Sequence, residues 1–216
     1  MQDYSNVTPL AAWGFEALSS ARVLILPDGC RDLIVRRSAN GARRLVSPLD
    51  FGPRWIPIEA GDRMQGLRLP PGVVIDGRAL AALWRPDEEL STLPSNLSEA
   101  LSLSEDIAEA LALIVLAPLS AEAAARRLGV SVRSLQRLLL RTGAPFGYWR
   151  GLARVRACAR RLIETPDHAL ADAAQASGYA DQAHMTREMR RWTGLTPAGV
   201  RRDTARAQVL LAPGYG

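Results

Sequence analysis

Two stretches of the chain decide the fold: GVSVRSLQRLLLRTG, Gly129 to Gly143, and GYADQAHMTREMRRWTG, Gly178 to Gly194. Both begin with glycine and a large apolar residue. Both then pass through a short polar turn into an arginine-bearing segment and close on Thr-Gly. The sequence therefore indicates that one small structural unit occurs twice within 216 residues.

The first copy has the pattern of a helix-turn-helix. Ala124 and Ala125 supply the small residues that crossing helices need, and Gly129 supplies a turn residue that tolerates positive φ. The expected shared apolar face consists of Leu128, Val130, Leu135 and Leu138. The opposite face carries Arg133, Gln136, Arg137 and Arg141. A helix with such a face can enter a DNA major groove, where Arg pairs with guanine and Gln with adenine.

The second copy repeats this plan. Ala173 and Ala174 are its small contacts, and Gly178 is its turn residue; the expected core residues are Tyr179, Met185 and Met189. Gly129 to Leu135 is six residues and Gly178 to Met185 is seven, which predicts a second turn longer by one residue. Its outward face offers Gln182, His184, Thr186 and Arg187, with Arg190 and Arg191 behind.

A long helix is predicted between the two units, from Pro145 to Glu164. Twenty helical residues span about 30 Å. Recognition helices on one face of B-DNA are about 34 Å apart, which is one helical turn. A single chain can therefore place two helices in successive major grooves without dimerising.

Charge separates the two halves of the chain. Residues 1–117 carry 11 Arg and 15 acidic residues, a net charge of −4. Residues 118–216 carry 16 Arg and 7 acidic residues, a net charge of +9. A basic C-terminal half suits a polyanionic partner, and a solvated basic face without a partner is the alternative.

The segment from about Glu105 to Asp203 resembles the DNA-binding domain of AraC/XylS-family transcription regulators. The pieces that carry this resemblance are LSAEAAARRLGVSVRSLQRLL, the connecting helix, ALADAAQASGY and HMTREMRRWTGLTP. Met185 and Met189 stand where the family signature has phenylalanine, and Val200 where Tyr is common. The resemblance implies that base contacts come from Arg133, Gln136, Arg137, Gln182, Ala183, Thr186 and Arg187. We expect Arg141, Arg190 and Arg191 to contact phosphates.

The N-terminal stretch predicts a small, mostly β domain. About five short segments rich in Val, Ile and Leu are separated by turn formers such as Pro27-Asp28-Gly29 and Asn40-Gly41. The stretch VLILPDGCRDLIV, with the later GLRLPPG, resembles a small, poorly characterised domain found before AraC-type DNA-binding regions. We expect a partial barrel or cupin-like fold. Trp13, Trp55 and Trp84 could line an apolar pocket, but a place in the core is the expected one, as it is for Trp149 and Trp192 in the helical half.

These patterns predict an α+β protein. We expect a sensing or dimerisation domain over residues 1–90, a linker over 91–104, a double helix-turn-helix domain over 105–205 and a tail over 206–216. No apolar run approaches the roughly 20 residues that cross a bilayer, and no signal peptide is recognised. Two cysteines, Cys30 and Cys158, make no disulfide framework, which favours the cytoplasm.

The expected function is a sequence-specific DNA-binding transcription regulator, not an enzyme, with no cofactor and no metal. The expected partners are double-stranded DNA, RNA polymerase, and either a small-molecule effector or a second subunit. One alternative is a constitutive regulator whose N-terminal domain only dimerises. The other is a thiol-based repair or redox-sensing protein centred on Cys30, although no nucleophile–base–orienter set accompanies that cysteine.

Overall fold

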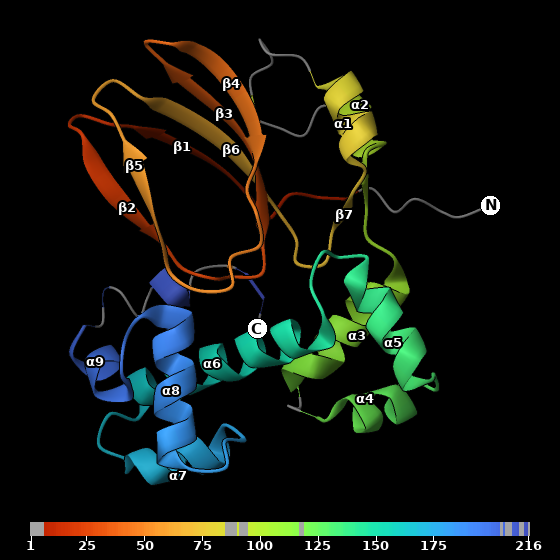
Figure 1. The fold of residues 1–216 in the computed structure, drawn as a ribbon, viewed down its shortest axis with the longest axis vertical. Helices are drawn as coiled ribbons and strands as arrows, with labels where there is room; N and C mark the ends of the chain where they lie inside the picture. Colours follow the sequence, from red (N-terminus) through yellow and green to blue (C-terminus); the bar gives the residue numbers. More distant parts are fainter. Residues whose placement is uncertain are drawn as a thin grey trace.

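The computed structural model describes residues 7–84, 90, 95–116, 119–203, 205, 209–211 and 214–215. A sheet-rich N-terminal half lies against a helical C-terminal half, as the α+β prediction requires (Figure 1). Within the described ranges, none of the helices combines the length and the apolar character needed to cross a bilayer.

Two antiparallel sheets form the N-terminal half. The larger has the order β1-β6-β3-β4, and the smaller pairs β2 with β5. The strands are β1 (Ala11–Glu16), β2 (Ala21–Ile25), β3 (Arg31–Ser38), β4 (Gly41–Val46), β5 (Arg54–Ile58) and β6 (Arg63–Leu69). The predicted turn at Asn40-Gly41 joins β3 to β4, with Gly41 at φ 100°. This arrangement is a small partial barrel of two facing sheets.

The five strands expected from the sequence are present as β2 to β6, and β1, which precedes them, was not expected. β1 reads AAWGFE, and its Ala, Gly and Glu have low strand propensity, so composition alone does not mark it. β1 is held by pairing with β6 over its whole length, from Ala11 opposite Arg68 to Glu16 opposite Arg63. Two further short strands, β7 (Val74–Ile75) and β8 (Leu101–Ser102), pair with each other.

One face of the larger sheet packs on two helices and forms its own core. These helices are α1 (Gly77–Leu83) and α2 (Ser95–Ser98). Leu33 and Leu67 from the sheet meet Leu80 and Trp84 of the α1 region, together with Leu97 of α2. Residues 91–94 of the expected linker lie outside the described residues, whereas α2 and β8 pack on the sheet domain. The boundaries of the linker remain a prediction.

The helical half begins at Ser104, whose Oγ accepts a hydrogen bond from Ile107 N at 3.4 Å. Ser120 and Ser131 cap the next two helices, since each Oγ accepts a hydrogen bond from the main-chain N–H three residues on. The helices are α3 (Glu105–Leu116), α4 (Ala121–Arg127), α5 (Val132–Leu140), α6 (Phe146–Glu164), α7 (Leu170–Ala176), α8 (Gln182–Thr193) and α9 (Pro197–Arg202).

The core of the helical half extends to residues of the N-terminal half. Leu26, which follows β2, belongs to the same buried cluster as Trp149 of α6. The ring of Phe51 lies 4.6 Å from that of Tyr148, centroid to centroid. Tyr215, in the expected C-terminal tail, is buried, and its hydroxyl donates a hydrogen bond to Leu111 O of α3 at 3.1 Å. The N-terminal half is therefore seated on the helices by side-chain packing.

The tryptophans divide between core and surface. Trp149 and Trp192 are fully buried in the helical half, and Trp84 is buried beside the larger sheet, as expected. Trp55 is half exposed, so its expected place in the core was wrong; it lies on the outer face of the two-stranded sheet. Trp13 faces a cavity between the two sheets.

Candidate nucleic-acid interface

The first predicted helix-turn-helix is present as α4 and α5. Ala124 and Ala125 are buried where the helices meet, and Gly129 makes the turn at φ 68°. Leu135 and Leu139 bury the inner face of α5. Val130 was expected in this apolar face and is 43% exposed. It precedes the N-cap of α5, and the turn directs its side chain away from the core, so this expectation was wrong.

The second unit is present as α7 and α8. Ala173 and Ala174 are buried, and Gly178 makes the turn at φ 72°. Met185 and Met189 are fully buried, which confirms their expected place in the core. The cap of α8 falls three residues after the turn glycine, whereas the cap of α5 falls two residues after its own. The predicted extra residue in the second turn is confirmed.

The outward face of α5 carries the predicted arginines. Leu135 and Leu139 point inward, and at about 100° per residue Arg133 and Arg137 point in the opposite direction. Both are exposed, and so is Gln136 on the flank of this face. Leu140 shares the outward face and is 58% exposed. The exposed face of α5 therefore carries two cations and one amide.

The outward face of α8 repeats the geometry of α5. Met185 and Met189 correspond to Leu135 and Leu139, so Arg187 takes the same angular position as Arg137. Ala183 takes the position of Arg133, and both Ala183 and Gln182 are exposed. Thr186 is half-buried, and its hydroxyl donates to Gln182 O at 2.9 Å. That hydroxyl can therefore offer an external partner only its lone pairs.

The three arginines expected at phosphates are all exposed: Arg141, Arg190 and Arg191. Arg141 follows the last turn of α5, and the other two lie in the last turn of α8. Arg191 is partly engaged within the protein. Its Nη1 lies 3.6 Å from Glu188 Oε1, and its guanidinium stands 5.5 Å from the Trp192 ring centre.

α6 holds the two units apart. α4 and α5 lie at one end of this helix and α7 and α8 at the other (Figure 1). α6 has 19 residues, about 28 Å at 1.5 Å per residue. Its inner face is fixed by a long buried stripe that includes Trp149, Leu152, Val155 and Leu162. Because α6 packs on both units, it acts as a stiff spacer.

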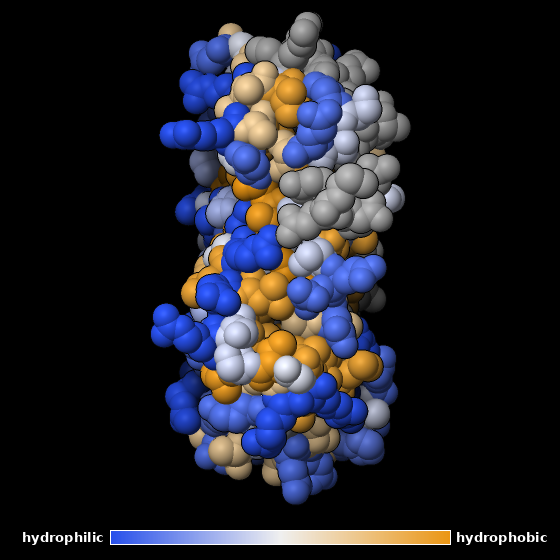
Figure 2. Space-filling view, turned by 90° about the vertical axis from the view of Figure 1, so that its right-hand side faces the viewer, coloured by the Kyte–Doolittle hydropathy of each residue, from blue (hydrophilic) through white to orange (hydrophobic). Residues whose placement is uncertain are grey.

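A groove beside α5 brings acidic residues to the predicted DNA-facing helix. It has a volume of about 360 Å³, and Asp106 and Glu109 of α3 line it together with Arg137 and Arg141. Figure 2 views the molecule from this side, where apolar side chains gather between charged ones. This groove could not be predicted from the sequence, because Asp106 and Glu109 suit the first turns of a helix in any context.

The thiol-based alternative finds no chemical support at Cys30. The residue is 4% exposed, and burial, followed by the charge of Asp28, raises the pKa of its thiol to about 12. A reactive cysteine needs the opposite shift, since the thiolate is the nucleophile. Among the described residues, no group of three His, Cys, Asp or Glu side chains is arranged to hold a metal ion.

A family model described as a helix-turn-helix domain matches residues 124–203. The HTH-type transcriptional regulator RipA of Corynebacterium glutamicum is 39% identical over 71 residues, which are 32% of this chain and 21% of that protein. The chain thus spans about a fifth of the length of the curated relative it matches.

Solved structures similar to part of this chain include two bacterial proteins. One is the C-terminal domain of AraT, a response regulator from Geobacillus stearothermophilus; it is 25% identical, has a TM-score of 0.43, and the match covers 46% of this chain and 86% of that one. The other is a transcriptional regulator with an AraC-type DNA-binding domain from Chromobacterium violaceum; it is 27% identical, has a TM-score of 0.42, and the match covers 50% and 95%.

The two units, their turn glycines and the connecting helix, together with the family match, define the class of the helical half. It is a helix-turn-helix domain. Its two helix-turn-helix units are joined by the one long helix α6.

Proposed function

We propose that this protein is a sequence-specific DNA-binding transcription regulator that reads two successive major grooves with one chain. The observation that carries the proposal is the angular equivalence of Arg137 and Arg187 on two exposed helix faces. The separation along α6, about 28 Å, is close to the 34 Å between grooves on one face of B-DNA.

In this proposal Arg133, Gln136 and Arg137 read one half of the site, and Gln182, Ala183, Thr186 and Arg187 read the other. Arginine and glutamine side chains can hydrogen-bond guanine and adenine edges in the major groove. Ala183 can contribute only an apolar contact, such as one with a thymine methyl. Arg141, Arg190 and Arg191 neutralise phosphates and fix the register of the protein on the duplex.

The sheet domain then regulates this binding, by taking up a small molecule or by dimerising. Leu26 of this domain is part of the buried core of the helices, so a change in the sheet domain reaches them through packed side chains. The outcome for transcription is a change in DNA affinity or in contact with RNA polymerase. This function belongs in the cytoplasm, where the DNA and the polymerase are.

The test is selection of bound sequences from random duplex DNA by the full-length protein. We expect a site with two information-rich halves whose centres are about 10–11 base pairs apart. Affinity for that site should fall steeply with salt, because arginine–phosphate contacts release counterions. Failure to enrich any sequence, or enrichment of one uninterrupted half alone, would overturn the two-groove proposal.

A further inference from the structure

The two sheets of the N-terminal half enclose a cavity of about 220 Å³. Its walls are apolar and come from both sheets. Trp13 and Phe15 lie on β1, Ile34 on β3, Met64 on β6, and Ile56 and Ile58 on β5. Gly66 leaves space for the Trp13 ring, since a Cβ at Gly66 would lie 2.3 Å from it. The volume holds roughly seven water molecules at about 30 Å³ each, or a compact ligand of about ten non-hydrogen atoms.

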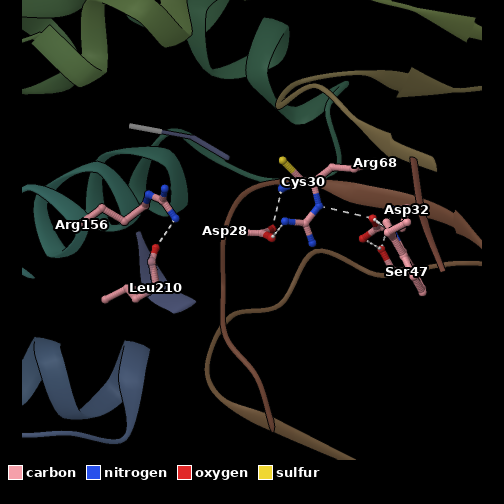
Figure 3. Close-up of polar contacts among 8 residues, drawn as sticks. Asp28, Cys30, Asp32, Ser47, Arg68, Arg156 and Leu210 are labelled. Atoms are coloured by element: carbon pink, nitrogen blue, oxygen red, sulfur yellow. Dashed lines mark hydrogen bonds and ion pairs between the residues drawn. The ribbon is translucent and has the colours of Figure 1, made fainter. Parts of the chain in front are cut away.

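One end of the cavity is charged (Figure 3). Arg68 lies between two carboxylates: its Nη1 is 3.1 Å from Asp28 Oδ2, and its Nε is 3.3 Å from Asp32 Oδ1. Trp13 Nε1 donates a hydrogen bond to the same Asp32 oxygen at 2.9 Å. Asp50 and Arg54 also line the cavity and form a two-point ion pair at 2.6 and 3.1 Å.

The charges in this cavity do not cancel. Three carboxylates, Asp28, Asp32 and Asp50, face two guanidinium groups, Arg54 and Arg68, which leaves one negative charge. Burial raises the pKa of Asp28 above its usual value, although Arg68 and the buried Arg156, which does not line the cavity, both act to lower it. To the charges that line the cavity an anionic ligand would add a fourth negative one, whereas a cation would balance them and face the aromatic rings of Trp13 and Phe15.

We propose that this cavity binds a small, largely apolar organic cation, such as an aryl-alkyl ammonium ion, with its charged group at the Asp28–Asp50 end. The proposal rests on the proposed function, since it names the chemical class of the regulating ligand. The apolar part fills the space between the sheets, where eight apolar side chains line the walls.

The segment Asp28–Asp32 connects this cavity to the helices. Asp28, Cys30 and Asp32 line the cavity, whereas Gly29 and Arg31 alternate with them and face the helical half. A Cβ on Gly29 would lie 3.0 Å from the Trp149 ring of α6. Arg31 Nη2 donates a hydrogen bond to Thr142 O, 3.1 Å away, directly after α5. The same five residues therefore contact both a cavity and the end of a predicted recognition helix.

The C-terminal segment is tied to the same place. The main-chain oxygen of Asp28 accepts a hydrogen bond from Tyr215 N at 2.8 Å. Arg156, a buried residue of α6, donates to Leu210 O. A cation that attracts the Asp28 carboxylate competes with Arg68 for it. The main chain of the same residue is hydrogen-bonded to Tyr215, so a shift of Asp28 is transmitted to the helical half. Binding in the cavity should therefore change the position of α5 relative to the sheet domain.

The first experiment titrates full-length protein with three matched probes: 2-phenylethylamine, 2-phenylethanol and phenylacetate. They have similar size and differ in charge, and calorimetry reports binding. We expect the ammonium probe to bind at least about tenfold more tightly than the alcohol, and phenylacetate not to bind. Tighter binding of phenylacetate, or no binding of any probe by folded protein, overturns the proposal.

Two variants and a control place the site. Asp28→Asn should remove the preference for the ammonium probe over the alcohol. Ile56→Trp leaves every charge in place and fills the cavity, so it should abolish binding of both probes even if Asp28→Asn does not fold. Glu16→Gln changes an exposed carboxylate that pairs with Arg63 and does not line the cavity, so it should change nothing. Unaltered binding by Ile56→Trp overturns the assignment of the cavity.

The second experiment tests the coupling with the selected DNA site. The ammonium probe should change DNA affinity by about fivefold or more, and DNA should change probe affinity by the same factor. Arg31→Met should keep both affinities and lose the coupling, whereas Arg37→Met, on the same strand but bonded to Gln65, should keep it. If the protein binds no DNA, the proposed function fails while the probe titration still decides the cavity. If DNA and probe both bind without coupling, the role of Asp28–Asp32 is wrong.

Discussion

Trp149 Nε1 of α6 donates a hydrogen bond to Thr142 Oγ1, 3.1 Å away, at the end of α5. The Thr142 hydroxyl in turn donates to Leu139 O at 2.6 Å. Both residues are buried, and Arg31 of β3 donates to the carbonyl of the same threonine. Thr142 therefore connects α5, the connecting helix α6 and the sheet domain.

Thr142→Val should destabilise the protein by about 1–3 kcal/mol, because it leaves the buried Trp149 N–H without its acceptor. Urea unfolding followed by circular dichroism measures the loss. Thr165→Val is the matched control: its hydroxyl also donates to a main-chain oxygen, Arg161 O at 2.8 Å, but at an exposed helix end. The control should stay within about 0.5 kcal/mol. Equal losses in the two variants would contradict the role given to Thr142.

Gly29→Ala should destabilise the joint between the halves more than Gly61→Ala does. Both glycines have positive φ, 76° and 84°, so both variants carry the backbone strain of an L-residue there. A Cβ on Gly61 meets nothing within 4 Å, whereas one on Gly29 lies 2.7 Å from Tyr215 Cβ. The additional loss from overpacking should be about 1–3 kcal/mol by urea unfolding. A Gly29 variant no less stable than the Gly61 variant would show that the joint is loose.

Much of the helical half could be predicted from the sequence because its signals are local. Caps such as Ser120 and Ser131, turn glycines such as Gly129, and the period of the apolar residues each act within one turn of helix. They fix which residues point outward, so the exposure of Arg137 and Arg187 could be anticipated. The exposure of Val130 could not be anticipated, because the direction of its side chain depends on the conformation of the turn.

The sheet half was harder to predict because its structure depends on distant pairing. β1 is held by β6, some 50 residues later in the chain, and its own composition is neutral. The sequence Pro27-Asp28-Gly29-Cys30 predicts only a turn. That Asp28 and Asp32 line a cavity between the sheets while Gly29 lies against α6 depends on the packing of distant elements. The neighbourhood of Asp106 and Arg137 likewise depends on how α3 packs on α5.

Cys30 should make the protein less stable at alkaline pH. The unfolded thiol loses its proton near pH 9, while burial holds the native pKa at about 12. Between these values the native state binds more protons, so the free energy of unfolding falls as pH rises, by at most about 1.4 kcal/mol per pH unit. Cys30→Ala should therefore lose less stability than the parent between pH 7 and pH 10. If the two proteins lose the same stability between pH 7 and pH 10, the Cys30 thiol ionises in the folded protein as it does in the unfolded one, which would contradict this prediction.

Residues proposed to contact bases should determine specificity, whereas residues proposed to contact phosphates should affect affinity alone. Arg137→Ala should cost about 1–3 kcal/mol on the preferred DNA site and relax selectivity in one half, and Arg187→Ala should do the same in the other half. Arg190→Ala should weaken all sequences alike and make the salt dependence shallower. Arg63→Ala, an exposed arginine of β6 paired with Glu16, is the control and should change neither property.

The decisive measurement is a base-by-base specificity profile for each variant at two salt concentrations. Arg137 and Arg187 lie on helices at opposite ends of α6, so their effects should be additive within about 0.5 kcal/mol in the double variant. The base pairs that each relaxes should be about one helical turn apart, since each helix enters its own groove. If the two variants relax the same base pairs, α5 and α8 read one groove between them, and the spacing set by α6 has another purpose.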